Sequence, residues 1–159
     1  MLPESFALLI GELERDGVPY VVVGGVAVNL LGYERATRDI DVMVPATPEA
    51  AALIRASLER LGATRPDGSE LPDYLFDGTH HIRALTPMGL VDLIPEGESP
   101  LSFDEVRASA RADELHGVVV WTSDLAHLVA LKRLADRPRD RDDLERLGDA
   151  YGALPDLGA

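Results

Sequence analysis

Two aspartates, Asp39 and Asp41, stand two positions apart in the apolar segment DIDVMV. This segment predicts a strand over 39–44, and side chains two positions apart on a strand point to the same face of the sheet. Two carboxylates placed together repel and raise each other's pKa unless a cation joins them. A hard cation such as Mg²⁺ binds one or two carboxylates and leaves its other positions to water and substrate phosphates. Since D-x-D is a common pair, two solvated acids at a strand end remain the alternative.

A pair of glycines, Gly24 and Gly25, follows a short β-branched run over 20–23 that predicts a buried strand. Glycines let backbone N–H groups approach a ligand, and the start of a helix adds a positive dipole end suited to phosphate. The thirteen residues of 26–38 allow a short helix and a return into the neighbouring strand. We therefore expect a triphosphate on the glycine turn and its metal on the aspartates. A tight turn without a ligand is the alternative.

A third acid, Asp92, is the only charged residue in the apolar strand predicted over 90–94. An unpaired buried carboxylate is costly, so Asp92 needs a partner or a metal. Three converging carboxylates could hold two metal ions roughly 3.5–4 Å apart, the arrangement used for in-line phosphoryl transfer. Asp92 could also deprotonate an attacking hydroxyl. A strand-edge residue facing water is the alternative.

The string VVVGGVAVNLLGYERATRDIDVMV resembles the nucleotidyltransferase superfamily that includes polymerase beta and the aminoglycoside nucleotidyltransferases. That family has a hydrophobic strand, Gly-Gly or Gly-Ser, a spacer of this length, Asp-x-Asp or Asp-x-Glu, and a third acid on a later strand. The segment DLAHLVALKRLADRPRDRDDL resembles the C-terminal part of the AbiEii-like branch, which contains many toxins of toxin–antitoxin pairs. The resemblance covers roughly residues 18–147.

This resemblance implies roles for five residues. Gly24 and Gly25 are expected to contact the nucleotide phosphates. Asp39, Asp41 and Asp92 are expected to bind Mg²⁺, with Mn²⁺ as the alternative cation, and to act as the catalytic carboxylates.

Five further residues are candidates for nucleotide binding: Arg35, Thr37, Arg38, Lys132 and Asp140. Arg35 and Arg38 flank Thr37 just before the acid pair, where they either clamp phosphates or offset local negative charge. The resemblance directs attention to Lys132, the only lysine, whose cation could reach a triphosphate or favour the C-terminal end of its own helix. It also directs attention to Asp140, which could instead cap the last helix.

Apolar spacing and capping residues predict the elements that carry these side chains. Helices are expected over 4–16, 26–31, 48–61, 103–113, 124–135 and 139–151, strands over 20–23, 39–44 and 118–121, and a hairpin from 80–85 and 90–94. His80 and His81 lack a further ligand at metal spacing, so we expect a role at the edge of this hairpin. The fold class is α/β (α+β), with a small mixed β-sheet flanked by helices. We expect one nucleotidyltransferase-like domain over 1–159, with its core at about 18–95 and a C-terminal helical part at about 102–151.

Charge and composition exclude several classes of function for this chain. Lys and Arg number 15 against 28 Asp and Glu, a net charge of −13, and there is no cysteine. The negative net charge excludes a broad basic face that coats nucleic acid. The lack of cysteine excludes a thiolate zinc site and a cysteine nucleophile. A divalent metal can still reverse the sign of the local field for a nucleotide. No secretory signal or apolar run of the ~20 residues that cross a membrane is visible, so a cytoplasmic protein without a membrane partner is expected.

The expected activity is transfer of a nucleoside monophosphate from NTP·Mg²⁺ to an acceptor hydroxyl with release of pyrophosphate. The acidity favours a small, cationic molecule or a protein hydroxyl over long nucleic acid as the acceptor. A toxin role with a cognate antitoxin as partner is the finer hypothesis. The alternative is a non-catalytic nucleotide-binding or toxin–antitoxin interaction domain on the same fold.

Overall fold

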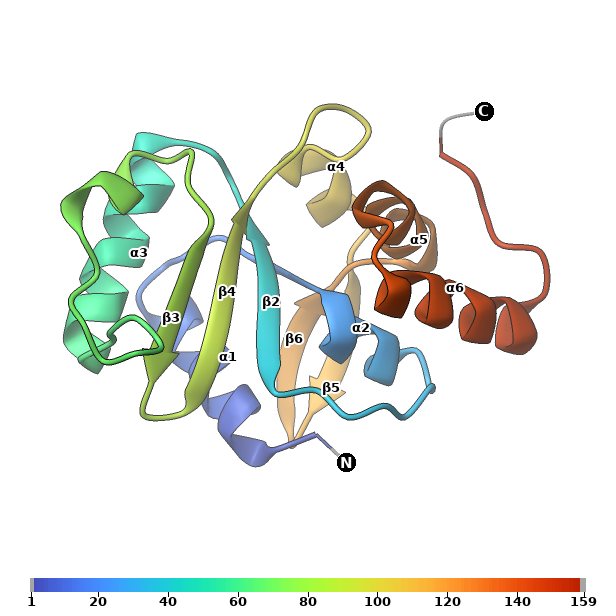
Figure 1. Ribbon diagram of the computed structural model, residues 1–159, viewed down its shortest axis with the longest axis horizontal. Coiled ribbons are helices and arrows are strands. Elements are labelled where there is room, and N and C mark those ends of the chain that lie inside the picture. Colours follow the sequence, from blue (N-terminus) through green and yellow to red (C-terminus); the bar gives the residue numbers. More distant parts are fainter. Residues whose placement is uncertain (1, 158–159) are drawn as a thin grey trace.

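In the computed structural model, which describes residues 2–157, a mixed sheet lies between two layers of helices (Figure 1). The strands are β1 (Val21–Val23), β2 (Asp39–Val44), β3 (Ile82–Thr86), β4 (Gly89–Pro95), β5 (Arg111–Leu115) and β6 (Val118–Thr122). The helices are α1 (Glu4–Arg15), α2 (Gly24–Leu30), α3 (Pro48–Leu61), α4 (Phe103–Ala108), α5 (Leu125–Ala135) and α6 (Pro138–Tyr151), with a 3₁₀ turn at Asp73–Phe76. The strand order is β3-β4-β2-β1-β6-β5. The expected fold class is confirmed.

Strand direction divides the sheet into antiparallel and parallel pairs. β4 runs parallel to β2, and β6 runs parallel to β1. The remaining neighbours, β1 with β2, β3 with β4 and β5 with β6, are antiparallel. The expected hairpin is therefore the β3–β4 pair, at one edge of the sheet.

One face of the sheet carries the main core. On β2, Ile40, Val42 and Val44 alternate toward this face, where they pack in one buried cluster with Leu9 of α1 and Ile54 of α3. Because side chains alternate along a strand, the intervening residues of β2 point to the opposite face. The buried, β-branched half of β2 thus fixes the direction in which its aspartates project.

The opposite face is covered only in part. Phe103 and Val106 of α4 pack there against Val21 and Val23 of β1. A third buried cluster joins α2, α5 and α6, which lie together beside the sheet (Figure 1). The first turn of α2 and the N-terminal half of β2 line a cavity beside these helices.

Capping residues define the ends of α3 and the start of α5. Thr47 Oγ1 accepts a hydrogen bond of 3.1 Å from the Ala50 N–H, and Gly62 ends α3 in the left-handed region at φ 67°. Asp124 caps α5 by accepting a hydrogen bond of 2.8 Å from the His127 N–H. Within residues 2–157, no helix combines the length and the apolar character needed to cross a bilayer.

The helix expected over 103–113 is wrong in its second half. α4 ends at Ala108, and Arg111–Leu115 is β5, which pairs with β6 through Leu115 and Val118. His116 and Gly117, both at positive φ (48° and 80°), form the two-residue turn between the strands. Turns of this type match the twist of a hairpin, so the His-Gly pair and the β-branched run after it favour a strand.

Candidate functional site

The three aspartates singled out in the sequence lie together on the partly open face of the sheet. Asp41 on β2 stands directly opposite Asp92 on the parallel strand β4, and Asp39 precedes Asp41 by two residues on the same face. One carboxylate oxygen from each of the three lies within 4.8 Å of the others. Asp92 is only 4% exposed, whereas Asp39 and Asp41 are half-buried. β2 and β4 thus bring acids 51 to 53 positions apart in the chain into one cluster.

The pKa values of Asp41 and Asp92 shift in opposite directions. Burial raises the pKa of Asp41 to about 7, and the nearby charges of Asp92 and Asp39 act in the same direction. Burial also raises the pKa of Asp92, but a hydrogen bond with His81 and the charge of Arg83 outweigh it, so the net shift is downward. Asp41 therefore lacks a neutralising partner that Asp92 has.

These donors fit a divalent cation. A cluster of carboxylate oxygens is the ligand set that Mg²⁺ and Mn²⁺ prefer. A cation beside Asp41 would remove the repulsion that raises its pKa. Asp39, Asp41 and Asp92 are the residues that could hold it.

The glycine turn lies directly against the acid cluster. Val23, the last residue of β1, is opposite Asp41, and Gly24 follows at φ 66° as the first residue of α2. A Cβ on Gly24 would lie 2.1 Å from Asp41 Oδ2, closer than any side chain permits. A Cβ on Gly25 would lie 3.0 Å from Thr37 Oγ1. Glycine at position 24 is thus required by both its backbone conformation and its contact with the carboxylate.

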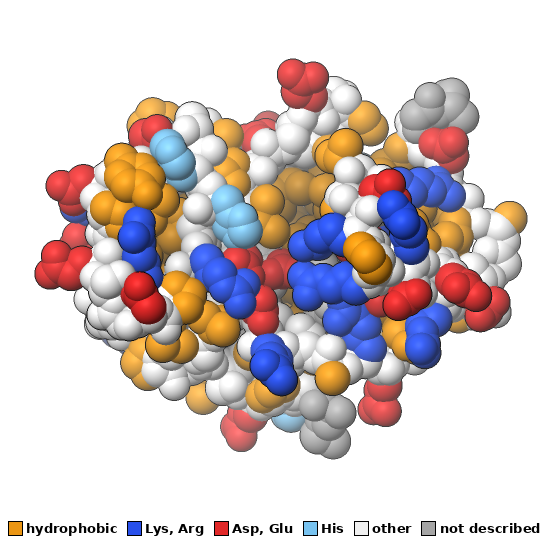
Figure 2. All heavy atoms as spheres, in the orientation of Figure 1, with side chains coloured by type: hydrophobic (Ala, Val, Ile, Leu, Met, Phe, Trp, Pro, Cys, Tyr) orange, Lys and Arg blue, Asp and Glu red, His pale blue; other side chains and the backbone are white. Residues whose placement is uncertain are grey.

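A cavity of about 240 Å³ opens beside the glycine turn and the acids. It is lined by Gly25, Arg35, Ala36, Thr37, Arg38, Asp39, Asp41 and Arg139. Figure 2 shows acidic side chains at the bottom of a hollow, with Lys or Arg side chains on both sides of it. The cavity therefore combines acids that could hold a metal with cations that could meet an anionic ligand.

Two exposed arginines of this cavity are free to meet a ligand. Arg38 comes from the loop before β2, and Arg139 comes from the first turn of α6. Within residues 2–157, neither guanidinium has an ion pair at salt-bridge distance; the charge of Arg139 acts on Asp41 from farther away. Sequence reasoning missed Arg139, because the mixed-sign run RPRDRDD is typical of a solvated helix start.

The β3–β4 hairpin forms the other wall of the acid cluster. Arg83 Nη1 donates to Asp39 Oδ2 and to Asp92 Oδ2, both at 2.8 Å. His81 Nε2 lies 2.8 Å from Asp92 Oδ1. The sequence predicted a position at the hairpin edge for His80 and His81, but neither this contact nor those of Arg83. The cross-strand register of the hairpin could have predicted the contact between Arg83 and Asp92, because the two residues are direct partners.

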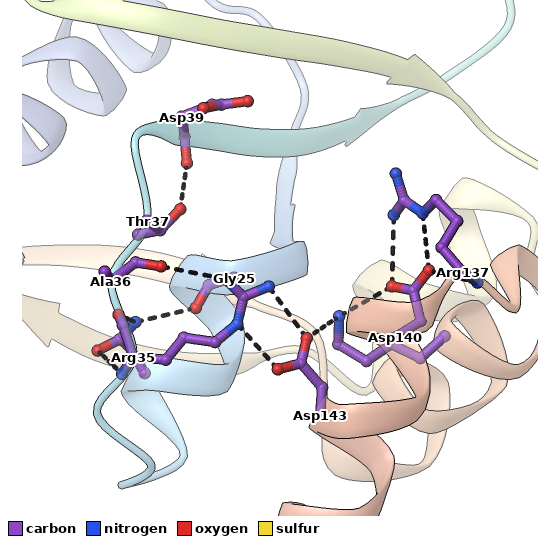
Figure 3. A network of polar contacts seen from close by, with 10 residues as sticks. Gly25, Arg35, Ala36, Thr37, Asp39, Arg137, Asp140 and Asp143 are labelled. Carbon is purple, nitrogen blue, oxygen red and sulfur yellow. Dashed lines mark hydrogen bonds and ion pairs between the residues drawn. The ribbon is translucent and has the colours of Figure 1, made fainter.

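The last group of candidates forms a buried ion network between α5, α6 and the loop before β2 (Figure 3). Lys132 Nζ lies 2.8 Å from Asp143 Oδ2 and 3.4 Å from Asp140 Oδ1. Arg137 Nε donates to Asp140 at 2.7 Å, and Arg35 Nε lies 2.9 Å from Asp143. The side chains of Lys132 and Asp140 are 5% and 1% exposed. In the structure Lys132 is thus paired with Asp143 and Asp140, and Asp140 is also paired with Arg137.

Comparisons with known proteins give the class of this fold. No protein-family model matches the chain, and neither does any curated sequence. The solution structure of the antibiotic-resistance factor ANT(2'')-Ia superposes with a TM-score of 0.63 at 19% identity, over 95% of this chain and 86% of that one. The crystal structure of ANT(2'')-Ia with adenylyl-2''-tobramycin gives 0.61 at 17% identity, over 94% and 90%.

A third solved structure is similar to the same degree. It is a Thermotoga maritima protein described as a candidate nucleotidyltransferase, with a TM-score of 0.61 at 14% identity, over 93% of this chain and 92% of that one. At these identities the likeness establishes the fold. The chain has a nucleotidyltransferase-like fold along nearly its whole length.

Proposed function

We propose that this protein is a metal-dependent nucleotidyltransferase that moves a nucleoside monophosphate from an NTP to an acceptor hydroxyl. The observation that carries the proposal is the contact between the glycine turn and the acid cluster, where Gly24 leaves no space for a Cβ beside Asp41. A backbone that approaches one carboxylate of the acid cluster this closely suits a phosphate chain that shares a cation with the cluster. The fold shared with ANT(2'')-Ia, which was crystallised with an adenylylated tobramycin, supports the same reaction.

The reaction is an in-line displacement at the α-phosphorus. The acceptor oxygen forms a bond to that phosphorus, the bond to the α–β bridging oxygen breaks, and pyrophosphate leaves with the electron pair. Asp39, Asp41 and Asp92 would hold Mg²⁺ or Mn²⁺, which when bound neutralises charge on the phosphates. We assign to Asp92 the additional task of accepting the hydroxyl proton, with His81 at 2.8 Å holding its carboxylate in place.

The basic side chains divide into two groups in this proposal. In the first group, Arg38 and Arg139 of the cavity contact the triphosphate, together with Thr37 and the backbone of Gly25. The backbone of the neighbouring Gly24 contacts the same phosphates. Guanidinium and backbone N–H groups of this kind position phosphates without covalent chemistry.

The buried group acts indirectly. Because the Lys132 ammonium lies among carboxylates, we assign Lys132, Asp140 and Arg35 to holding the cavity wall in place. We propose this supporting role instead of the direct phosphate contacts expected from the sequence.

The acceptor and the biological role are the finer parts of the proposal. A net charge of −13 disfavours long nucleic acid and favours a small molecule or a protein hydroxyl. The likeness of the C-terminal segment to the AbiEii-like branch supports a cytoplasmic toxin with a cognate antitoxin. Co-purification with the product of an adjacent gene would test that role.

Incubation of the purified protein with Mg²⁺ and each α-labelled NTP tests the proposed reaction. Expected results are nucleotide binding that requires the metal and pyrophosphate release that depends on an acceptor. Asp41→Asn should abolish both, whereas Asp149→Asn, on the exposed side of α6, should leave both unchanged. Binding without transfer to any acceptor would favour the non-catalytic domain, and no binding of any NTP at millimolar concentration would refute both proposals.

A further inference from the structure

The strand order gives the acid cluster two different walls. β2 lies in the middle, β1 and its glycine turn are on one side, and β4 followed by the edge strand β3 are on the other. If the proposed function holds, the triphosphate occupies the glycine side, near Gly24 and Arg139. The acceptor then approaches Asp92 along the β3–β4 hairpin, and the side chains of that hairpin decide which acceptor fits.

The charges of this hairpin are unlike those of the whole molecule. Along residues 82–95, the only charged side chains are Arg83 and Asp92, and His81 directly precedes β3. Their side chains form one chain of contacts, from His81 to Asp92 and from Arg83 to both Asp92 and Asp39. The side chains of His81 and Arg83 are 54% and 45% exposed, so both can also meet a ligand.

Arg83 competes with any cation that the acid cluster binds. Its Nη1 atom lies 2.8 Å from oxygens of two of the three carboxylates that could hold a metal. A divalent cation among these carboxylates neutralises them and repels the guanidinium. The guanidinium stays charged, because an arginine does not lose its proton in proteins. With a metal held by the three aspartates, the Arg83 guanidinium would be an uncompensated cation on the acceptor side of Asp92.

We propose that Arg83, assisted by His81, selects an acceptor that carries an anionic group, a phosphate or a carboxylate, near its reactive hydroxyl. A guanidinium binds both groups through a pair of parallel hydrogen bonds. Amine-rich acceptors such as tobramycin meet like charge at this wall. The inference rests on the proposed function and names the acceptor class for the same site.

The net charge of −13 does not oppose a small anion. Exposed charges more than about 8–10 Å apart are largely screened at physiological salt, so a small molecule responds to the charges within the hollow. A long anionic polymer extends beyond the hollow and meets the acidic remainder of the surface. The acceptor is therefore a small anionic molecule.

Matched acceptors test the selection. The protein would be supplied with Mg²⁺, labelled ATP and one of glycerol, glycerol 3-phosphate, glycerate or tobramycin, and transfer would be measured for each. Both anionic probes are expected to be used at least about tenfold better, in kcat/KM, than neutral glycerol, the effect of one charge-assisted hydrogen-bond pair. Preference for the phosphate or for the carboxylate identifies the source of the anion. Equal use of glycerol, or preferential use of tobramycin, overturns the inference.

Variants of Arg83 distinguish a role in acceptor selection from a purely structural role, because only the former changes acceptor preference and metal affinity in opposite directions. Arg83→Gln should reduce the preference for anionic over neutral acceptor about tenfold through KM, and Arg83→Lys should restore part of it. The same Arg83→Gln protein, titrated calorimetrically with Mg²⁺ alone, should bind the metal severalfold more tightly because its competitor is gone. Weaker metal binding together with weaker acceptor use would mean that Arg83 only supports the fold, and would overturn the inference.

The control is Arg15→Gln, which removes the same charge from the exposed end of α1, on the other side of the sheet. It should change neither acceptor preference nor metal affinity. Failure of the inference is distinguishable from failure of the proposed function. Without any ATP binding or pyrophosphate release the function itself fails, whereas transfer without anion preference refutes only the role of Arg83.

Discussion

The guanidinium of Arg35 binds the carboxylate of Asp143 through two contacts, Nε to Oδ1 at 2.9 Å and Nη2 to Oδ2 at 3.0 Å. Asp143 lies 108 positions further along the chain, on α6, and is also held by Lys132 at 2.8 Å. The loop that forms one wall of the candidate nucleotide cavity is thus attached to the two C-terminal helices. The helices therefore contribute to the site through the position of this loop.

Loss of Asp143 is expected to be strongly destabilising. Asp143→Ala would leave Lys132 and Arg35 without a carboxylate that both share in a buried environment. Breaking a buried ion pair by removing one partner costs about 3–5 kcal/mol. Denaturant unfolding monitored by circular dichroism measures this loss. Asp142→Ala, one position earlier and exposed, serves as the control and should change the free energy of unfolding by less than ~0.5 kcal/mol.

Glycine at position 24 should be irreplaceable. Gly24→Ala places a Cβ 2.1 Å from Asp41 Oδ2 at φ 66°, so Asp41 must move and the backbone is strained by about 1–2 kcal/mol. We expect loss of metal-dependent nucleotide binding, measured by calorimetry. Gly148→Ala is the matched control, because a Cβ at that α6 position meets nothing within 4 Å. There the replacement should stabilise the helix by roughly 0.5–1 kcal/mol. Unchanged nucleotide binding by Gly24→Ala would contradict the proposed role of the turn.

The metal-free protein should lose stability as the pH rises from about 4 to 7. The pKa of Asp41 is raised from 3.8 to about 7, so in this range the folded state holds a proton that the unfolded state has released. Stability falls with pH wherever the folded state binds more protons. Asp92, Asp124 and Asp140 have lowered pKa values, so their contributions are lost only as the pH falls below about 4.

Melting temperatures measured in EDTA between pH 5 and pH 8 check this prediction. Asp41→Asn should flatten the pH dependence and raise the melting temperature at pH 8 above that of the unchanged protein. A pH profile identical in both proteins would show that Asp41 does not titrate in this range.

Metal affinity should have the opposite pH dependence. A cation binds the ionised carboxylate, so Mg²⁺ must displace a proton from Asp41 when the pH lies below about 7. Affinity is expected to fall about tenfold for each pH unit below that value. Calorimetry in two buffers with different ionisation enthalpies measures the released proton. Affinity that stays constant between pH 8 and pH 6 would count against Asp41 as a metal ligand.

Features set by local spacing could be predicted from the sequence. The period of two along β2 places Asp39 and Asp41 on one face whatever the strand pairs with. A single charge in an apolar strand similarly marks Asp92 as a residue in need of a partner. Their convergence required the parallel pairing of β2 with β4, which the alternation of elements made plausible.

Features set by distant partners could not be predicted. Arg83 acquires its role from cross-strand register, and Lys132 from the packing of α5 on α6, which buries the ammonium between Asp140 and Asp143. The sequence pattern of a lysine near a helix end is the same whether its ammonium binds a phosphate or a buried carboxylate. β5 was missed because its polar residues resemble a helix surface until the His116 turn is considered.

Because Lys132 is buried, its chemical modification can measure how often the C-terminal helices open. The chain has no other lysine, and the side chain of this one is 5% exposed. Acylating reagents can modify it only in molecules whose α5–α6 unit has separated, since a paired and inaccessible ammonium is not nucleophilic. The rate at which mass spectrometry detects the adduct at residue 132 therefore reports how often α5 and α6 separate around Lys132.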